Sequence, residues 1–224
     1  MKRFCLALTL SLLCSLSQAV DLSGISSTEA SSGLKTALTK GADYAVANLG
    51  RQDGFLGNPK VRIGLPDSLK KGEKLLKTLG MGKYTDELTI AMNRAAEQAT
   101  AEAKPILIDA IKKMTVQDAK AILTGGDDSV TQFFRQNTSA QLTQKFRPIV
   151  KRATGKVRLA EKYNQFAGKA SGLLGADADL DTYVTRNAMD GLFLMIAEQE
   201  RSIRQNPLGT GSAVLQKVFG ALKR

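Results

Sequence analysis

Three polar residues lie within one helical turn of one another on a predicted helix, and a fourth lies on another predicted helix that looks internal. Asn93, Arg94 and Glu97 adjoin an apolar stripe, and Asp190 adjoins the most apolar turn of its own segment. Two carboxylates with an arginine could perform acid–base chemistry if they met in an accessible cleft. Buried charges must also satisfy one another, so a structural salt-bridge network is the favoured interpretation.

Two further pairs of charged residues have a spacing that could bring them together. Glu200 and Arg204 are four positions apart, which places them on one face of a helix, and Arg186 and Asp190 have the same spacing. If such groups face inward, they either hold the fold together or line a ligand pocket. Asn93, Arg94, Glu97, Asp190, Phe193 and Arg204 are therefore the candidate binding residues.

Most familiar catalytic templates are excluded by composition. The chain has no histidine, and its two cysteines, Cys5 and Cys14, both lie near the amino terminus. Ser32 to Lys35 and Ser68 to Lys71 show the S-x-x-K spacing, but the other motifs of penicillin-recognising enzymes are missing and chance matches are expected in a lysine-rich chain. No residue is therefore predicted to be catalytic.

Three alternating aspartates, Asp177, Asp179 and Asp181, resemble the first ligands of a calcium loop. In an EF-hand the sixth position is glycine and the twelfth is glutamate, whereas here they are Thr182 and Ala188. Helix capping by Asp179 or Asp181 is the favoured role. We predict no metal and no cofactor.

Basic residues gather in one stretch of the C-terminal half, between Lys145 and Lys162, where Glu161 is the only acidic residue. The apolar residues between them are expected to face the core while the cations coat the outside. This surface could bind an anion, or it could be a solvated face without a partner. The predicted patch consists of Lys145, Arg147, Lys151, Arg152, Lys156 and Arg158.

The first nineteen residues have the pattern of a cleavable secretory signal. Lys2 and Arg3 precede an apolar run from Phe4 to Leu16, which is too short to span a bilayer, and small residues flank the expected cleavage site before Val20. The net charge of +11 would fall to +9 after cleavage. We therefore expect a soluble periplasmic protein, for which anionic lipid or an acidic envelope polymer is a more natural partner than nucleic acid.

The remaining residues, 20–224, are expected to form a single all-α domain, an irregular bundle of about eight to ten helices. The stretch from Leu180 to Asn206 should be its core helix. All six residues from Leu192 to Ala197 are apolar, which predicts a turn buried on every side. Other helices are expected at about residues 26–49, 68–79, 85–104, 105–114, 115–124, 128–134, 138–150, 156–170 and 212–222.

Residues 50–66 form the longest irregular connection, with glycine and proline at six positions and a short β-like piece at 61–63. Long loops often carry binding function. Phe55 and Leu56 could form a recognition tip on the surface, or a plug that returns into the core. The plug is the favoured interpretation, because large apolar side chains are usually buried.

Several separated motifs, in order, resemble an uncharacterised family of exported bacterial proteins, domain of unknown function 4197. The resemblance implies a helical domain and a Gram-negative envelope location, and it brings no activity or catalytic residues. It rests on Asp53-Gly54-Phe55, Met92-Asn93-Arg94-Ala95-Ala96-Glu97, Met114-Thr115, Asp118-Ala119, Gly125-Gly126-Asp127, Tyr183-Val184, Asp190-Gly191-Leu192-Phe193, Arg204, Asn206-Pro207 and Val218-Phe219-Gly220.

Three functional hypotheses follow. The leading one is a non-enzymatic protein that binds an apolar or anionic envelope component, either at the basic patch or in a pocket lined by Phe193, Met195 and Met92. The alternative is an interaction or assembly factor of the envelope that uses the 50–66 loop. The third, an enzyme using Asp190, Glu97 and Arg94, requires these side chains to converge.

Overall fold

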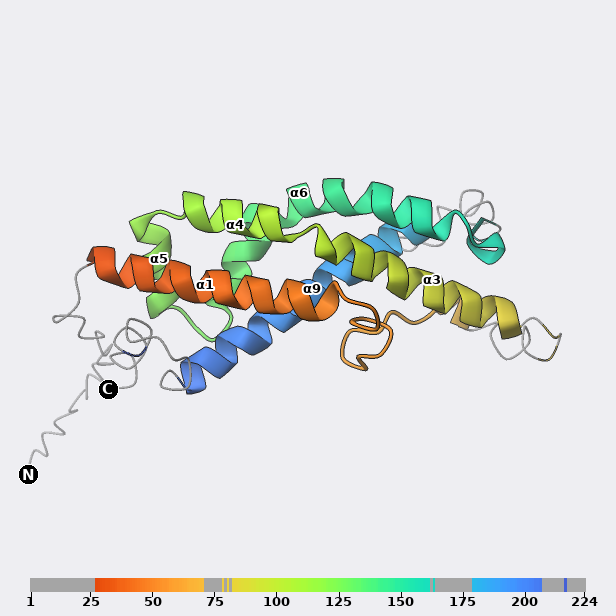
Figure 1. The fold of residues 1–224 in the computed structure, drawn as a ribbon, viewed down its shortest axis with the longest axis horizontal. Coiled ribbons are helices and arrows are strands. Elements are labelled where there is room, and N and C mark those ends of the chain that lie inside the picture. Colours follow the sequence, from red (N-terminus) through yellow and green to blue (C-terminus); the bar gives the residue numbers. More distant parts are fainter. Residues whose placement is uncertain are drawn as a thin grey trace, which may run out of the picture.

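The computed structural model of the chain describes residues 27–70, 78, 80, 82–161, 163, 179–206 and 216. The predicted signal segment and nearly all of the predicted helix at 212–222 lie outside these residues, as do Lys162 and Asp177. Over the described part of the chain the backbone forms helices joined by turns, without a strand (Figure 1). The all-α, single-domain fold class is confirmed.

The described helices with defined bounds vary from nine to 26 residues in length. They are α1 (Ser27–Leu49), α3 (Gly82–Ala101), α4 (Lys104–Lys113), α5 (Val116–Thr124), α6 (Ser129–Thr154) and α9 (Leu180–Gln205). Residues 67–70 and 158–161 are also helical.

Helices α6 and α9 form an antiparallel pair that other helices cover. Thr154, at the end of α6, donates a hydrogen bond to Asp181 at the start of α9, at 2.7 Å. At the opposite end, Glu200 of α9 accepts a hydrogen bond from the N–H of Val130, at 3.0 Å. Helices α1 and α3 both pack against α9, and α3, α4 and α5 pack against α6. The core axis is therefore a pair of helices, of which the predicted core helix is one.

The apolar turn of α9 follows the prediction at four of its six positions; the exceptions are Leu194 and Ala197, and Ala197 is half-buried. Phe193 and Ile196 are buried, with exposed fractions of 0% and 2%. Leu194, by contrast, is 40% exposed, so the prediction of burial on every side is wrong. A helix packed against neighbours on part of its circumference leaves its remaining face open, and Leu194 lies on that face.

Two predicted helices, at 128–134 and 138–150, are one continuous helix, α6. The Thr138 to Gln141 capping signature does not act as a cap, because the Thr138 hydroxyl donates to the carbonyl of Phe134 within the same helix, at 2.6 Å. Pro148 lies inside α6. The predicted start at Thr85 is also shifted, since α3 begins at Gly82.

Other local predictions are confirmed. Thr115 and Asp118 form the predicted capping box at the start of α5, and Asp179 caps α9 by accepting from the N–H of Asp181. Pro105 stands in the first turn of α4, where its missing N–H costs nothing. The piece at 61–63 is not a strand.

Candidate functional site

The first cluster of polar residues joins α3 to the 50–66 loop. Asn93 is buried, and its side chain makes two hydrogen bonds to Ile63 of the loop. The side-chain oxygen accepts from the N–H of Ile63, and the side-chain nitrogen donates to the carbonyl of Ile63, each at 2.8 Å. The side-chain nitrogen also donates to the carbonyl of Thr89, at 2.8 Å. Asn93 therefore gives Ile63 the backbone partners that a neighbouring strand would otherwise supply.

Glu97 holds the other end of the loop. One of its carboxylate oxygens accepts from the backbone N–H groups of Phe55 and Leu56, both at 3.1 Å. The other oxygen accepts from Arg94 at 2.7 Å, and Arg94 also donates to Asp53 at 2.8 Å. The hydrogen bond to Glu97, followed by that to Asp53, raises the pKa of Arg94 above its ordinary value, although burial acts in the opposite direction. Arg94 thus stays charged and paired.

Phe55 is the predicted plug, and its ring is completely buried. The ring lies against Gly191 of α9, so closely that a Cβ atom at Gly191 would approach Cε1 of Phe55 to 2.7 Å. Asp53, two residues before, has a φ of 63°, in the left-handed region. The loop is therefore anchored by a buried ring, by backbone hydrogen bonds to side chains and by an ion pair, so the plug prediction is confirmed for Phe55.

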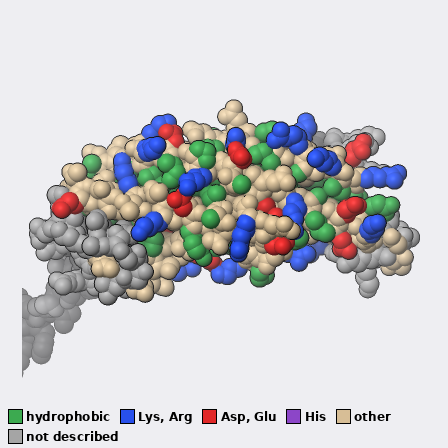
Figure 2. Space-filling model, viewed as in Figure 1, with side chains coloured by type: hydrophobic (Ala, Val, Ile, Leu, Met, Phe, Trp, Pro, Cys, Tyr) green, Lys and Arg blue, Asp and Glu red, His purple; other side chains and the backbone are tan. Residues whose placement is uncertain are grey.

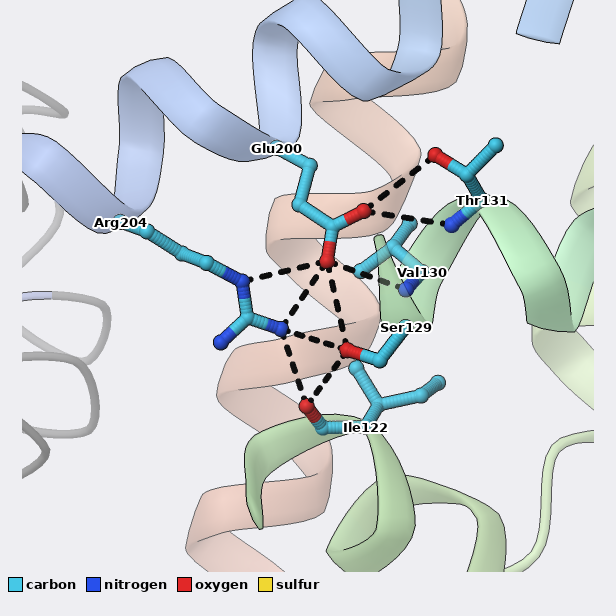
Figure 3. Close-up of polar contacts among 6 residues, drawn as sticks. All are labelled: Ile122, Ser129, Val130, Thr131, Glu200 and Arg204. Carbon is cyan, nitrogen blue, oxygen red and sulfur yellow. Dashed lines mark hydrogen bonds and ion pairs between the residues drawn. The ribbon is translucent and has the colours of Figure 1, made fainter. Parts of the chain in front are cut away.

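The second cluster joins α9 to the start of α6 (Figure 3). Asp128, the residue before α6, makes no capping hydrogen bond with its side chain. Instead, the carboxylate of Glu200 accepts from the N–H groups of Val130 and Thr131, at 3.0 and 3.2 Å. Arg204 donates to Glu200 at 2.9 Å and to the carbonyl of Ile122, also at 2.9 Å. Arg204 thereby links α5, α6 and α9.

The third cluster, around Asp190, has different partners. Asp190 accepts from Arg135 of α6 at 3.0 Å, and both side chains are substantially exposed. The guanidinium carbon of Arg135 lies 4.7 Å from the centroid of the Phe193 ring, which is a cation–π contact. Asp190 is therefore not in the network of Arg94 and Glu97, where the enzyme hypothesis would place it.

The candidate binding residues are thus divided among separate contacts. Asn93, Arg94 and Glu97 meet at the loop, whereas Arg204 meets Glu200. Phe193 and Met92 have no exposed surface, and Met195 is 8% exposed, so they belong to the core. In the part of the chain that is described, no three metal-ligating side chains gather at one point.

All six residues of the predicted basic patch are exposed on the C-terminal half of α6 and the residues that follow it. Lys145 pairs with Glu102 and Arg147 with Asp179, both at 3.2 Å. Among the described residues, no carboxylate pairs with Lys151, Arg152, Lys156 or Arg158. On the face shown in Figure 2, basic side chains are interspersed with acidic and apolar ones.

Two grooves were not identified from the sequence. One, of about 640 Å³, lies between the 50–66 loop and α3, where Leu56, Leu65 and Ile90 line it together with Arg62 and Lys70. The other, of about 760 Å³, lies between α1 and α4 and reaches Val116. The sequence did hold a signal for the second groove, because α1 carries serine, threonine and lysine at helical spacing from Thr28 to Lys40.

No helix in the described part of the chain combines the length and apolar character needed to cross a membrane. No curated protein and no solved structure gives a significant match to the chain. The family described as "Protein of unknown function (DUF4197)" matches residues 24–220, which is most of the chain and includes all three polar clusters. The chain therefore belongs to the family of proteins of unknown function DUF4197.

Proposed function

We propose that this protein is a non-enzymatic binding protein of the periplasm, and that its ligand is an anionic component of the cell envelope. The proposal includes cleavage of residues 1–19 as a signal peptide and export of residues 20–224. The binding surface is the unpaired patch, which we define as Lys151, Arg152, Lys156 and Arg158.

One observation carries the proposal. Lys151 and Arg152 of the unpaired patch lie in the last turn of α6, and its other two cations lie in the residues that follow this helix. All four are exposed and have no carboxylate partner among the described residues. The apolar residues of the same stretch, Phe146 and Val150, face the core. A segment that turns apolar residues inward and four exposed cations outward, unpaired among the described residues, presents a positive field to solvent, and such a field attracts anionic surfaces.

The polar clusters support a role without catalysis. Both carboxylate oxygens of Glu97 and of Glu200 accept hydrogen bonds from backbone or side-chain groups of the protein. Their arginine partners, Arg94 and Arg204, are bound to the same carboxylates. Groups held in this way stabilise a fold, whereas a general base needs an accessible lone pair next to its substrate.

Sedimentation with lipid vesicles tests the proposal. We expect the protein to bind phosphatidylglycerol vesicles more tightly than phosphatidylcholine vesicles, and to release them as salt is added. Changing Lys151 and Arg152 to glutamate should weaken binding about tenfold or more, because each basic residue near an anionic surface contributes roughly 1 kcal/mol. Equal binding to both lipids would contradict the proposal.

A matched variant separates the patch from net charge. Lys120 and Arg201 are exposed, lie outside the patch and have no carboxylate partner among the described residues. Changing both to glutamate alters the net charge by the same amount. If this variant lost as much binding as the patch variant, long-range charge alone would explain the result.

The groove beside the 50–66 loop favours a second function, the docking of an envelope protein. Its apolar residues include Ile90, which is 47% exposed, and the loop that forms one wall is held in place by Asn93 and Glu97. Because the loop is already held in one conformation, it loses less conformational entropy when a partner binds than a flexible loop would. Under this alternative, changing Lys151 and Arg152 to glutamate should leave the binding of the envelope protein unchanged.

A further inference from the structure

A second basic site lies far along the chain from the unpaired patch, in the groove between α1 and α4. The two helices are antiparallel. Lys35 of α1 is hydrogen-bonded to the carbonyl of Lys112, near the end of α4, whereas the carboxylate of Asp43, later in α1, lies 2.9 Å from the ammonium group of Lys104 at the start of α4. Figure 1 shows them side by side at the end of the bundle where α5 lies. Val116, at the start of α5, extends the groove beyond α4.

The floor and the walls of this groove differ in polarity. Ile111 is 3% exposed and Ile108 is partly buried, so the floor consists of apolar core residues. Val116 is 49% exposed and continues this apolar strip into solvent. The α1 wall carries hydroxyl groups, of which those of Thr36 and Thr39 already donate to carbonyls of their own helix. These two threonines therefore offer methyl groups and acceptor oxygens to the groove.

Every charged side chain that lines the groove is a lysine: Lys35, Lys40 and Lys112. The ammonium group of Lys35 donates to the carbonyl of Lys112 across the groove, at 3.3 Å, which leaves its other N–H groups for a ligand. Two carboxylates on the same helices, Asp43 and Asp109, are paired elsewhere, with Lys104 and Lys113. The groove thus combines three positive charges with an apolar floor and no lining carboxylate.

We propose that the α1–α4 groove binds a single-chain anionic amphiphile, with its carboxylate or phosphate between the lysines and its alkyl chain along Ile108, Ile111 and Val116. The volume of about 760 Å³ lies within the range of small-molecule sites. The α1 wall from Thr28 to Lys40 extends over about 18 Å, at 1.5 Å per residue, which gives room for an extended chain. This inference goes beyond the binding of an anionic surface at the unpaired patch and concerns separate residues.

The occupant is chosen by charge and polarity together. An anionic polymer would satisfy the lysines but leave the apolar strip unused, and a neutral apolar molecule would leave the lysines without a partner. A cationic amphiphile would be repelled by three lysines. Only a molecule that has both an anionic group and an apolar chain makes use of both features.

Titration of the full-length mature protein, observed by isotope-edited NMR of its methyl groups, tests this inference. The probes are dodecanoate, which carries a carboxylate, and lauroyl-lysophosphatidylglycerol, which carries a phosphate. We expect at least one of them to shift the methyl signals of Ile108 and Val116, while the methyl signals of Ile63, a buried residue of the 50–66 loop, stay unchanged. Comparison of the two probes identifies the preferred anionic group. The inference is overturned if neither probe shifts these signals, or if dodecyltrimethylammonium or acetate shifts them as strongly.

Variants assign the binding to the lysines. Changing Lys40 and Lys112, both exposed, to glutamate should weaken binding at least about tenfold. The control in which Lys120 and Arg201 are changed to glutamate should bind normally. Equal weakening in both variants would show that net charge, and not the groove, controls binding. Circular dichroism confirms that each variant folds.

The two proposals fail independently. If the amphiphile does not bind but the protein still sediments with phosphatidylglycerol vesicles in a manner dependent on Lys151 and Arg152, only the groove assignment is wrong. If the amphiphile binds but the protein does not bind the vesicles, the proposal for the groove is supported and the proposal for the unpaired patch is overturned.

Discussion

Two glutamates perform the same task at two places in the chain. Glu97 accepts from two consecutive backbone N–H groups in a loop, and Glu200 accepts from two consecutive N–H groups at the start of α6. Each is also paired with an arginine on its own helix, Arg94 three residues before or Arg204 four residues after. Glu200 replaces the capping side chain that Asp128 does not provide, and its charge is favourable at a helix N-terminus.

Substitution of Glu97 tests this role at the level of one residue. Glu97→Ala should lower the free energy of unfolding by about 3 kcal/mol, because it removes the acceptor of the buried Phe55 N–H and the partly buried Leu56 N–H, and leaves Arg94 only its pair with Asp53. Glu97→Gln should cost less, since its amide oxygen can still accept from Phe55 and Leu56. Urea denaturation measures both values.

A matched control uses a carboxylate that makes only a surface pair. Glu102 is about half exposed and contacts Lys145, so Glu102→Ala should change the free energy of unfolding by less than about 1 kcal/mol. If Glu97→Ala lowered the free energy of unfolding as little as Glu102→Ala, the 50–66 loop would not depend on the carboxylate of Glu97.

At the scale of helices, local capping signals in the sequence correctly predicted helix starts and ends at places where one helix ends and another begins. The Thr115 to Asp118 box begins α5, and Gly125 ends it. The similar signature at Thr138 to Gln141 misled the prediction, because the buried residues Phe134, Leu142 and Phe146 keep one helical period across it. Packing of that continuous face against α3 and α9 overrides the local capping preference.

The candidate site was predictable only in part, for a related reason. The spacing of Arg94 with Glu97, and of Glu200 with Arg204, correctly indicated pairs on one helix face. Their remaining partners include backbone N–H groups, such as those of Phe55 and Val130, and a backbone N–H has no sequence signature. The α1–α4 groove depends on which helices are neighbours, which residue spacing alone does not determine.

Two helical glycines test how tightly the loop is packed on α9. An added Cβ at Gly191 would meet Phe55 at 2.7 Å and Val61 at 3.3 Å, both belonging to buried loop residues. Gly191→Ala should therefore destabilise the protein by about 1 to 2 kcal/mol, since overpacking outweighs the gain in helix propensity. Thermal unfolding followed by circular dichroism gives the change.

Gly41 of α1 is the matched control, because an added Cβ there would meet only Gln199 at 3.9 Å, an ordinary contact. Gly41→Ala should stabilise the protein by up to about 1 kcal/mol, through helix propensity. If both substitutions stabilised the protein, the loop would be able to move away from α9, and Phe55 would not act as a plug.

At the scale of the whole molecule, the two glutamate clusters hold separate parts of the structure to the central helices. The Glu97 cluster fixes the 50–66 loop to α3, and Phe55 of that loop packs on the middle of α9. The Glu200 cluster joins the last turns of α9 to α5 and α6. Among the described residues the clusters share no residue and no hydrogen-bond partner, although Phe55 of one and Val130 of the other belong to one hydrophobic core.

This arrangement predicts how substitutions combine. The destabilisations caused by Glu97→Gln and Glu200→Gln should add to within about 0.5 kcal/mol, as expected for sites without shared partners. Glu200→Gln and Arg204→Gln should not add, because each residue already loses its partner when the other is changed, and coupling of roughly 1 kcal/mol or more is expected. Double-mutant cycles in urea measure both couplings. Strong coupling between Glu97 and Glu200 would mean that the loop and the start of α6 move as one unit, and the two clusters would then have to be treated as a single network spanning α9.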